Sequence, residues 1–431
     1  MLINYTFNNF RSFKNEATLS MVAGKQRTFN ENMIRQDGKR ILPSAVIYGA
    51  NASGKSNIIM SMAVMSKIVT YGSLDKLSSD VDMLETYPFA YRGEDVPMEF
   101  KMEFSNHGEQ YIYKFAIIVE HFQRGMRKIV SEHLDKKFGG SYTEIFDRNE
   151  QQVQINKTKK VLELLGGSKE FLAEIEKKLN NSIDSKELFL CSGFKSVISS
   201  QVADEVIDFF KKKMMVVSDF TLKKANLTFS MDELPEKDFF AWNHMLEGFV
   251  RGADFGPQDI AFRSSKGDDE YSADMKLVSI YHSGGADYMM PAELMESRGT
   301  LKLIDFAILF QRIFTEGGVL VLDEFDAAIH PEIIKGIIAL FHDSSINKKK
   351  AQLIFTTHNP IYLNNKIFRR DQILFVEKDP DEYESAIFSL ADFGSVDVRN
   401  DQNYLINYFK GKYSTLPFID FAKIFNLDGG E

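Results

Sequence analysis

The chain has 431 residues, of which 44% are hydrophobic and 26% are charged, and its formal net charge is −9. These proportions are typical of a folded globular protein, which excludes a disordered or collagen-like chain. The length is enough for about two or three domains. The acidic balance argues against broad coating of nucleic acid, although it allows a local basic patch.

The start of the chain predicts a strand rather than a targeting segment. Residues 1–7 alternate between apolar and polar side chains and lack the basic and apolar regions of a secretory signal. No stretch approaches the ~18 apolar residues that a membrane span needs. A single cysteine excludes an intrachain disulfide. We therefore expect a cytoplasmic protein that does not contact membranes.

Periodicity predicts the elements of the first part of the chain. Alternating apolar residues indicate strands over residues 2–8 and near 17–21, and a short apolar run indicates a buried strand over 45–48. A helix is expected from Ser56 to about residue 69. Period-two alternation returns between residues 98 and 147, which predicts antiparallel strands with one solvated face.

A phosphate-binding loop stands between the predicted strand over 45–48 and the helix that follows. Residues 49–56 match G-x-x-x-x-G-K-[ST] completely, in the strand–loop–helix setting that this motif requires. The loop N–H groups and the helix N-terminus are expected to face phosphates, with Lys55 on the β- and γ-phosphates and the Ser56 hydroxyl on Mg²⁺. The residues predicted to contact the nucleotide here are Asn51, Ala52, Ser53, Gly54, Lys55, Ser56 and Asn57. The sequence therefore predicts binding of a nucleoside triphosphate.

The rest of the chain predicts a helical region and then a second part of an α/β core. Apolar residues recur at helical spacing over residues 159–180, which predicts helical structure there. Residues 204–214 also predict a helix. A long helix and three buried strands are predicted further on, over residues 301–314, 319–322, 352–356 and 372–376. Short β-branched and aromatic runs between helices indicate parallel strands covered on both faces. A large insertion thus separates the two halves of the core.

Polar residues follow two of these strands and are candidates for catalysis. Asp323 and Glu324 follow the strand over 319–322, and ligands bind beside the carboxyl ends of parallel strands. Asp323 is expected to hold Mg²⁺ and Glu324 to orient or deprotonate the attacking water. His358 follows the strand over 352–356 and is predicted to contact the γ-phosphate. Such residues are often merely structural, but their combination with the phosphate loop favours catalysis.

Several further segments accompany these motifs in a specific order along nearly the whole chain. They are residues 9–13, 296–300, 322–324, Asp326, 330–331, 357–358, 369–373, 376–378 and 408–413. With the phosphate loop, they resemble the ATP-binding-cassette ATPases of the SMC and OLD type. The resemblance is greatest to the short bacterial subclass of phage-defence and restriction-linked loci, which includes the RloA proteins and the PARIS ATPase AriA.

This resemblance implies a fold and a set of ligands. The fold class is α/β: an ABC-ATPase head of the SMC/OLD type with a mainly parallel core sheet, an antiparallel β subdomain and a helical insertion. The implied parts are an N-terminal lobe over residues 1–150, a helical or mixed insertion over 151–280 and a C-terminal lobe over 281–431. The implied ligands are ATP and Mg²⁺, with Ser56 and Asp323 on the metal.

The resemblance also implies a head-to-head dimer or a higher homo-oligomer. Ser297 and Gly299 match the signature segment, which reaches the γ-phosphate bound by the facing subunit, and Asp326 matches a loop at the dimer interface. The residues alone leave an ordinary helix N-cap as an alternative for Ser297 and Gly299. Two departures stand out: Arg298 replaces a common glycine, and no glutamine between Ser56 and Gln110 can supply the usual Q-loop residue.

The function implied by the resemblance is an ATPase whose heads dimerise with ATP and separate after hydrolysis. Its implied role is that of a regulator in phage defence, acting with a separate effector protein. The acidic run at residues 268–270 is interpreted as solvated rather than as part of a nuclease. Two alternatives stay open: a DNA-repair or DNA-end-binding head, which predicts salt-sensitive binding of duplex DNA, and an ATP-dependent assembly scaffold with negligible turnover. DNA or a phage component is a candidate partner.

Overall fold

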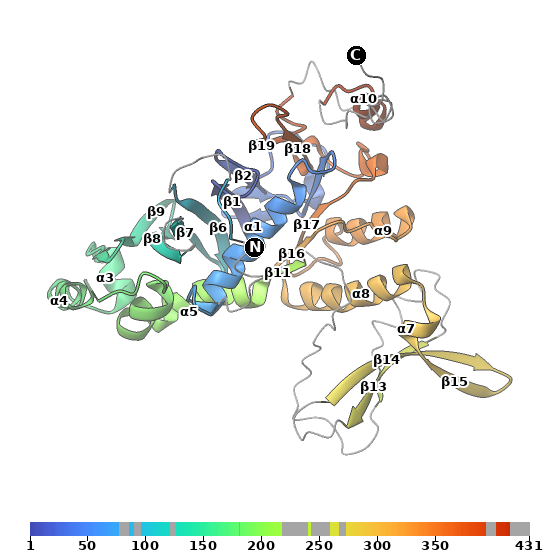
Figure 1. Ribbon diagram of the computed structural model, residues 1–431, viewed down its shortest axis with the longest axis horizontal. Coiled ribbons are helices and arrows are strands. Elements are labelled where there is room, and N and C mark those ends of the chain that lie inside the picture. The colour runs from blue at the N-terminus through green and yellow to red at the C-terminus, as the bar shows by residue number, and fades with distance from the viewer. Residues whose placement is uncertain are drawn as a thin grey trace, which may run out of the picture. The chain divides into compact units, whose positions relative to one another are not determined.

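The computed structural model describes residues 1–76, 86–89, 96–120, 126–180, 182–217, 240–242, 259–266, 273–393 and 402–413 (Figure 1). The chain forms two compact units. The first comprises residues 1–218, 318–325 and 341–431, and the second comprises residues 219–317 and 326–340. The acidic run at 268–270 lies outside the described residues. Within the described part, no helix combines the length and apolar character needed to cross a membrane.

The first unit contains an antiparallel sheet of the order β10-β9-β8-β7-β6-β1-β2. Its strands are β1 (Leu2–Asn8), β2 (Ala17–Ser20), β6 (Met98–Asn106), β7 (Glu109–Glu120), β8 (Met126–Phe138), β9 (Ser141–Asn149) and β10 (Gln152–Ile155). Along β6, buried apolar side chains alternate with more exposed charged ones from Met98 to Phe104, as a sheet with one solvated face requires. The antiparallel strands predicted from period-two alternation are therefore confirmed.

The second sheet of this unit has the order β11-β16-β17-β5-β18-β19. Its strands are β5 (Ser44–Gly49), β11 (Met214–Val217), β16 (Val319–Leu322), β17 (Gln352–Thr356), β18 (Ile373–Lys378) and β19 (Ser385–Ser389). All neighbours pair in parallel except β18 and β19. Every residue of β5, β16 and β17 is buried, which explains their continuous apolar sequences. Because these strands run the same way, their carboxyl ends share one edge.

The helices of the first unit correct two sequence predictions. The region over 159–180 is not one helix but α3 (Lys159–Leu165) and α4 (Lys169–Leu179), because Gly166 adopts a φ of 68° and ends α3. The helix predicted over 204–214 is α5 (Ser200–Asp208) followed by the π-helical segment η4 (Phe209–Lys213). Met214 instead begins β11, where it pairs with Val319.

Several shorter elements complete this unit. They are η1 (Asn30–Asn32), β3 (Ile34–Gln36), β4 (Lys39–Ile41), η3 (Leu190–Ile198), η6 (Pro360–Tyr362), η7 (Arg370–Gln372) and α10 (Tyr404–Phe409). The helix α1 (Lys55–Tyr71) follows the phosphate loop after β5, as predicted, and ends at Gly72, whose φ is 71°.

The second unit contains a separate antiparallel sheet of the order β12-β13-β14-β15. Its elements are β12 (Phe240–Trp242), β13 (Asp259–Lys266), β14 (Ala273–Ser283), β15 (Ala286–Pro291), α7 (Ala292–Met295) and α8 (Arg298–Glu316). The helix α9 (Pro331–His342) begins in this unit, with the proline at its first position, where a missing N–H costs nothing. Residues 151–280, expected as a helical or mixed insertion, thus contribute helices and the strands β10 and β11 to the first unit, and strands to the second.

A buried ion pair connects the antiparallel sheet to the helical segment behind it. Glu132 of β8 and Arg148 of β9 are opposite each other in the sheet and fully buried. The Glu132 carboxylate accepts hydrogen bonds from the N–H groups of Phe189 and Leu190, at 2.6 and 2.8 Å. Arg148 donates to the carbonyl oxygen of Glu187 at 2.6 Å. Each charge therefore has partners on both elements, which is the condition under which a buried pair is tolerated.

Replacing Glu132 by glutamine is expected to destabilise the protein strongly. The substitution leaves the Arg148 guanidinium buried without a counter-charge, which costs about 3–5 kcal/mol of unfolding free energy. Urea denaturation followed by circular dichroism measures this loss. The matched control is Glu174→Gln on α4, where the ion pair with Lys178 is solvent-exposed. Equal denaturation midpoints for the two variants would contradict the role given to Glu132.

Candidate functional site

The loop between β5 and α1 depends on two close approaches of the backbone. A Cβ atom at Gly49 would lie 2.4 Å from the carbonyl oxygen of Val376 and 2.5 Å from Ser53 Oγ. Gly54 has a φ of 113°, and a Cβ atom there would lie 2.6 Å from Ser385 Oγ. Side chains cannot be accommodated at such distances, so both glycines are needed for packing as well as for the turn.

Side chains from β19 and from the turn after β1 hold this loop in place. Ser385 Oγ donates to the carbonyl oxygen of Ser53 at 2.6 Å, and the Ser385 N–H donates to the carbonyl oxygen of Ser12 at 2.6 Å. Asn57, in the first turn of α1, donates to Ser12 Oγ at 2.7 Å. Sequence reasoning missed Ser12 and Ser385, because neither residue lies in the phosphate loop itself. For Ser12, the segment 9–13 was the available signal.

Lys55 carries a buried positive charge at the start of α1. Its Nζ donates to the carbonyl oxygens of Gly49 and Ala50, each at 2.9 Å. Burial lowers the pKa of Lys55 to about 8, although the nearby carboxylates of Asp323 and Glu324 partly oppose this shift. The ammonium group is therefore held inside the loop and stabilised by carboxylates that follow a different strand.

A threonine at the end of β17 positions the two carboxylates. The Thr356 hydroxyl donates to Asp323 Oδ1 and accepts a hydrogen bond from the Glu324 N–H at 2.7 Å. Asp323 is buried, whereas the Glu324 side chain is exposed. Glu324 has a φ of 44°, a left-handed conformation that costs a non-glycine residue about 1–3 kcal/mol. The sequence predicts only a strand at Thr356, although its place beside Asp323 follows from the parallel pairing of β16 and β17.

His358 lies at the same edge of the core sheet. Its Nε2 is 3.9 Å from Glu324 Oε1, and both side chains are substantially exposed. In the phosphate loop, Asn51, Ala52 and Ser56 are exposed, while Ser53, Gly54 and Lys55 are buried. The structure thus brings the phosphate loop, Asp323, Glu324 and His358 to one edge, with exposed groups available to a ligand.

Ser297, Gly299 and Asp326 belong to the second unit. Ser297 is the exposed N-cap of α8, and its Oγ accepts a hydrogen bond from the Thr300 N–H at 3.1 Å. A Cβ atom at Gly299 would lie 2.3 Å from the carbonyl oxygen of Ala328, so Gly299 packs tightly against the loop that contains half-buried Asp326. The helix begins at Arg298, earlier than predicted. The structure shows Ser297 as the N-cap of α8. Contact of Ser297, Gly299 and Asp326 with a nucleotide stays a prediction.

Glu296 holds this segment on the sheet of the second unit. Its Oε1 accepts hydrogen bonds from Ser279 Oγ at 2.6 Å and from the Tyr281 hydroxyl at 2.8 Å. Sequence reasoning included Glu296 only in the resemblance, with no role. Ser279 and Tyr281 are two residues apart on β14, and the alternation of a strand places such residues on the same face of the sheet.

The first unit has the chemical groups that a nucleoside triphosphate with Mg²⁺ requires. The Ser53 hydroxyl is buried without a hydrogen-bond partner in the described part of the chain, beside a buried ammonium group. Such groups match an anionic ligand, and N–H groups at the start of a helix add to the positive potential. Asp323 and the exposed Ser56 hydroxyl carry oxygen atoms, the type of ligand that Mg²⁺ prefers. The residues present therefore fit this ligand.

This chain has low overall similarity to solved structures of SMC heads. A crystal structure of the SmcHead bound to the C-winged helix domain of ScpA has a TM-score of 0.43 and 13% identity, covering 92% of this chain and 99% of that chain. The SMC head domain from Thermotoga maritima has a TM-score of 0.36 and 14% identity, covering 90% and 98%. No curated protein sequence matches the chain significantly.

A protein family matches the chain from the start of β5 to beyond β17. The matched residues, 44–364, include the phosphate loop, Asp323, Glu324 and His358, and they make up well over half of the chain. The chain therefore belongs to the family described as "AAA domain, putative AbiEii toxin, Type IV TA system".

Proposed function

We propose that this protein binds ATP with Mg²⁺ and hydrolyses it at the edge formed by β5, β16 and β17. The observation that carries the proposal is the convergence of Lys55, Asp323 and Glu324 from distant parts of the sequence. Bound ATP supplies the phosphoanhydride bond that is cleaved. Membership of an AAA-domain family supports the same activity.

Each residue at this edge has a distinct role in the proposed reaction. Lys55 and the loop N–H groups bind the phosphates, while Ser56 and Asp323 hold the metal. Glu324 orients the attacking water and accepts its proton, and His358 contacts the γ-phosphate. Thr356 is a positioning residue, because its hydroxyl fixes Asp323 and the backbone of Glu324.

The proposal extends to a dimer in which each nucleotide is shared between two copies. Ser297 and Gly299 of one copy complete the site of its partner, and Asp326 lies at the interface. Exposure of Ser297 and Arg298 at the start of α8 supports this arrangement, since both side chains are accessible. Loss of the γ-phosphate removes the shared contacts and releases the dimer, as in other switches that depend on this group.

The proposed biological role is regulation of a bacterial defence system. The family description refers to a toxin of a toxin–antitoxin system, which supports a role of this kind. ATP-dependent dimerisation would control a separate effector protein, with DNA or a phage component as the trigger. Co-purification of the chain with the product of a neighbouring gene, with and without ATP, tests this part.

Replacing Glu324 by glutamine is expected to reduce ATP hydrolysis about 10²–10⁴-fold, because the variant lacks the general base. Nucleotide affinity stays unchanged, since Lys55 and the loop are intact. Phosphate release measures turnover, and mass measurement with and without ATP follows the dimer. Glu174→Gln, on the exposed face of α4, is the control and retains full activity. Absence of turnover in the unsubstituted protein, alone or with DNA, would contradict the proposed reaction.

Mixing two inactive variants is expected to restore activity if the sites are shared. Ser297→Asp keeps a residue that caps α8 well but directs a carboxylate at the partner's phosphates. A dimer of one Ser297→Asp copy and one Glu324→Gln copy has one intact and one doubly altered site. If equal amounts are mixed and the copies pair at random when ATP is added, about one quarter of the unsubstituted activity is expected, because half of the dimers are mixed and each of these has one intact site out of two.

The two variants measured separately provide the reference for this experiment. Each is expected to be nearly inactive, while melting temperatures close to that of the unsubstituted protein verify the fold. A mixture with no more activity than the sum of its components would show that Ser297 does not act across a dimer. Lys55 would still bind nucleotide in that case, so failure of the shared site is distinct from failure of the ATPase.

The lowered pKa of Lys55 predicts a pH dependence of nucleotide binding. Without ligand, Lys55 loses its proton as the pH rises through about 8, whereas a bound triphosphate favours the charged form and raises the pKa. Affinity is therefore highest below pH 8 and falls about tenfold per pH unit above it, until the pKa of the bound state is reached. Calorimetric titration with ATP and excess Mg²⁺ between pH 7 and 9.5 measures this slope.

The matched control is Lys55→Arg, whose guanidinium stays charged throughout this range. Its affinity for ATP is expected to be independent of pH, whatever its absolute value. A flat profile for the unsubstituted protein would show that Lys55 is fully protonated without nucleotide.

A further inference from the structure

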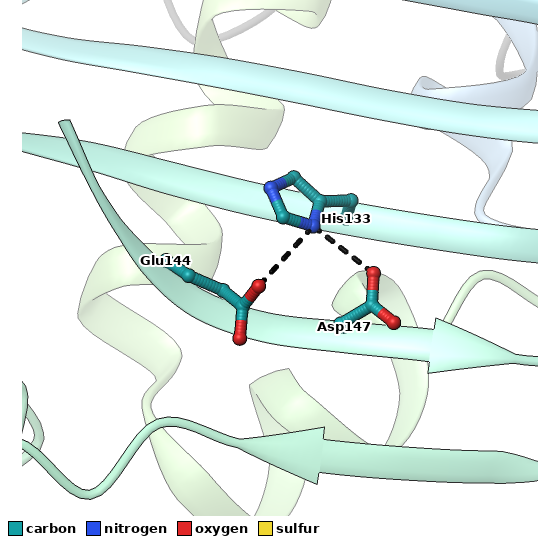
Figure 2. A group of neighbouring side chains, drawn as sticks. All are labelled: His133, Glu144 and Asp147. Carbon is teal, nitrogen blue, oxygen red and sulfur yellow. Dashed lines mark hydrogen bonds and ion pairs between the residues drawn. The ribbon is translucent and has the colours of Figure 1, made fainter.

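A histidine and two carboxylates converge on the solvated face of the antiparallel sheet, on β8 and β9. The Nδ1 atom of His133 is 3.0 Å from Asp147 Oδ1 and 3.8 Å from Glu144 Oε2. One oxygen of each carboxylate and this nitrogen all lie within 4.8 Å of one another. Figure 2 shows both carboxylates directed at the same ring nitrogen from the neighbouring strand.

A β-bulge makes this convergence possible. Asp147 and Glu144 are three residues apart, so regular alternation along β9 would place them on opposite faces of the sheet. The register shifts between Leu134 and Asp135, where Leu134 pairs with Phe146 and Asp135 with Glu144. Ile145 is the extra residue, and it is buried together with Phe146. The bulge thus turns Glu144 to the face that carries His133, which is a known use of bulges.

The second ring nitrogen of His133 has its own carboxylate partner. Its Nε2 is 3.1 Å from Asp135 Oδ1, within hydrogen-bond reach. A proton on Nε2 that is donated to Asp135 leaves the lone pair on Nδ1, directed at Glu144 and Asp147. Metal-binding histidines commonly have this arrangement, in which an outer carboxylate fixes the tautomer and the ring orientation.

The charges of the cluster also favour a cation. Asp135 and Glu144 are directly opposite in the sheet, a pairing of like charges that is destabilising by itself. Lys114, the residue opposite His133 on β7, forms an ion pair with Glu99 at 2.9 Å instead. Three carboxylates therefore surround one imidazole, which leaves an excess of negative charge even when His133 is protonated.

We infer that His133, Glu144 and Asp147 form a binding site for a divalent transition-metal ion of the Zn²⁺ or Mn²⁺ class, with Asp135 as its outer partner. One imidazole nitrogen and two carboxylate oxygens are a ligand set suited to these ions. The side chains are half-exposed, so water completes the coordination. The buried Glu132–Arg148 pair lies on the opposite face of the same two strands and holds their backbones together.

The site is tested by titrating Zn²⁺ into the chelator-treated full-length protein without nucleotide. Calorimetry is expected to detect about one ion per chain at this site, since its ligands act together. The hydrogen bond to Asp135, with contributions from Asp147 and Glu144, raises the pKa of His133 to about 9. Binding at pH 7 therefore displaces a proton, and the measured heat is expected to depend on the ionisation enthalpy of the buffer.

Variants separate this site from other places where the metal could bind. His133→Gln and Asp147→Asn are expected to abolish the high-affinity phase, and Asp135→Asn to weaken it about 10- to 100-fold, as loss of an outer partner does. The matched control is Asp287→Asn in the second unit, where His282 faces Asp287 and Asp259 with different ring nitrogens. This control is expected to bind Zn²⁺ like the unsubstituted protein.

Substitution with Co²⁺ adds a spectroscopic readout, because visible absorption bands report nitrogen and oxygen coordination directly. The bands are expected in the unsubstituted protein and in Asp287→Asn, and to be lost in Asp147→Asn, a half-exposed position where the fold is not at risk. Absence of Zn²⁺ binding, or equal affinity in the unsubstituted protein and in both His133→Gln and Asp147→Asn, would overturn the inference.

Discussion

Parallel pairing of β5, β16 and β17 is the constraint on which the candidate site depends. It places the phosphate loop, the two carboxylates and His358 at one edge, although they are far apart in the sequence. Buried glutamines fix the opposite ends of these strands. Gln352 bonds to the backbone of Leu2 and Leu42, and Gln372 donates to the carbonyl oxygen of Ser44 at 3.1 Å. Since buried amides need partners, these bonds penalise a shifted register.

Tight packing then holds the phosphate loop and the carboxylates rigidly at this edge of the sheet. Gly49 lies against the backbone of Val376, and Ser385 reaches the backbone of Ser53, so both β18 and β19 support the phosphate loop. Thr356 does the same for the carboxylates, using one hydroxyl for Asp323 and Glu324. Preorganisation of this kind lets charged groups act without rearrangement. The strained φ of Glu324 is maintained by these contacts rather than by local preference.

The sequence was sufficient for the features that depend on local pattern. Apolar runs predicted β5, β16 and β17, and the complete glycine motif predicted the loop and the start of α1. The sequence was insufficient where contacts between distant segments determine the local structure. Met214 lies at the end of a helical pattern, yet pairing with Val319 draws it into a strand. The brace formed by Ser12 and Ser385 joins distant segments, and the bulge at Ile145 breaks the alternation from which faces are predicted. The sequence singles out the segment that contains Ser12, but it does not indicate which distant residue that segment, Met214 or the bulge will contact.

The path of the chain offers a physical link between the two units. Residues 318–325, which contain β16, Asp323 and Glu324, belong to the first unit, but the chain enters the second unit immediately before and after them. On one side, α8 connects Ser297 to the start of β16; on the other, the loop from Asp326 packs against Gly299. The segment with both carboxylates is thus tied at each end to the part that carries Ser297. The carboxylates therefore lie on a short segment of the core sheet at whose two ends the chain passes into the second unit.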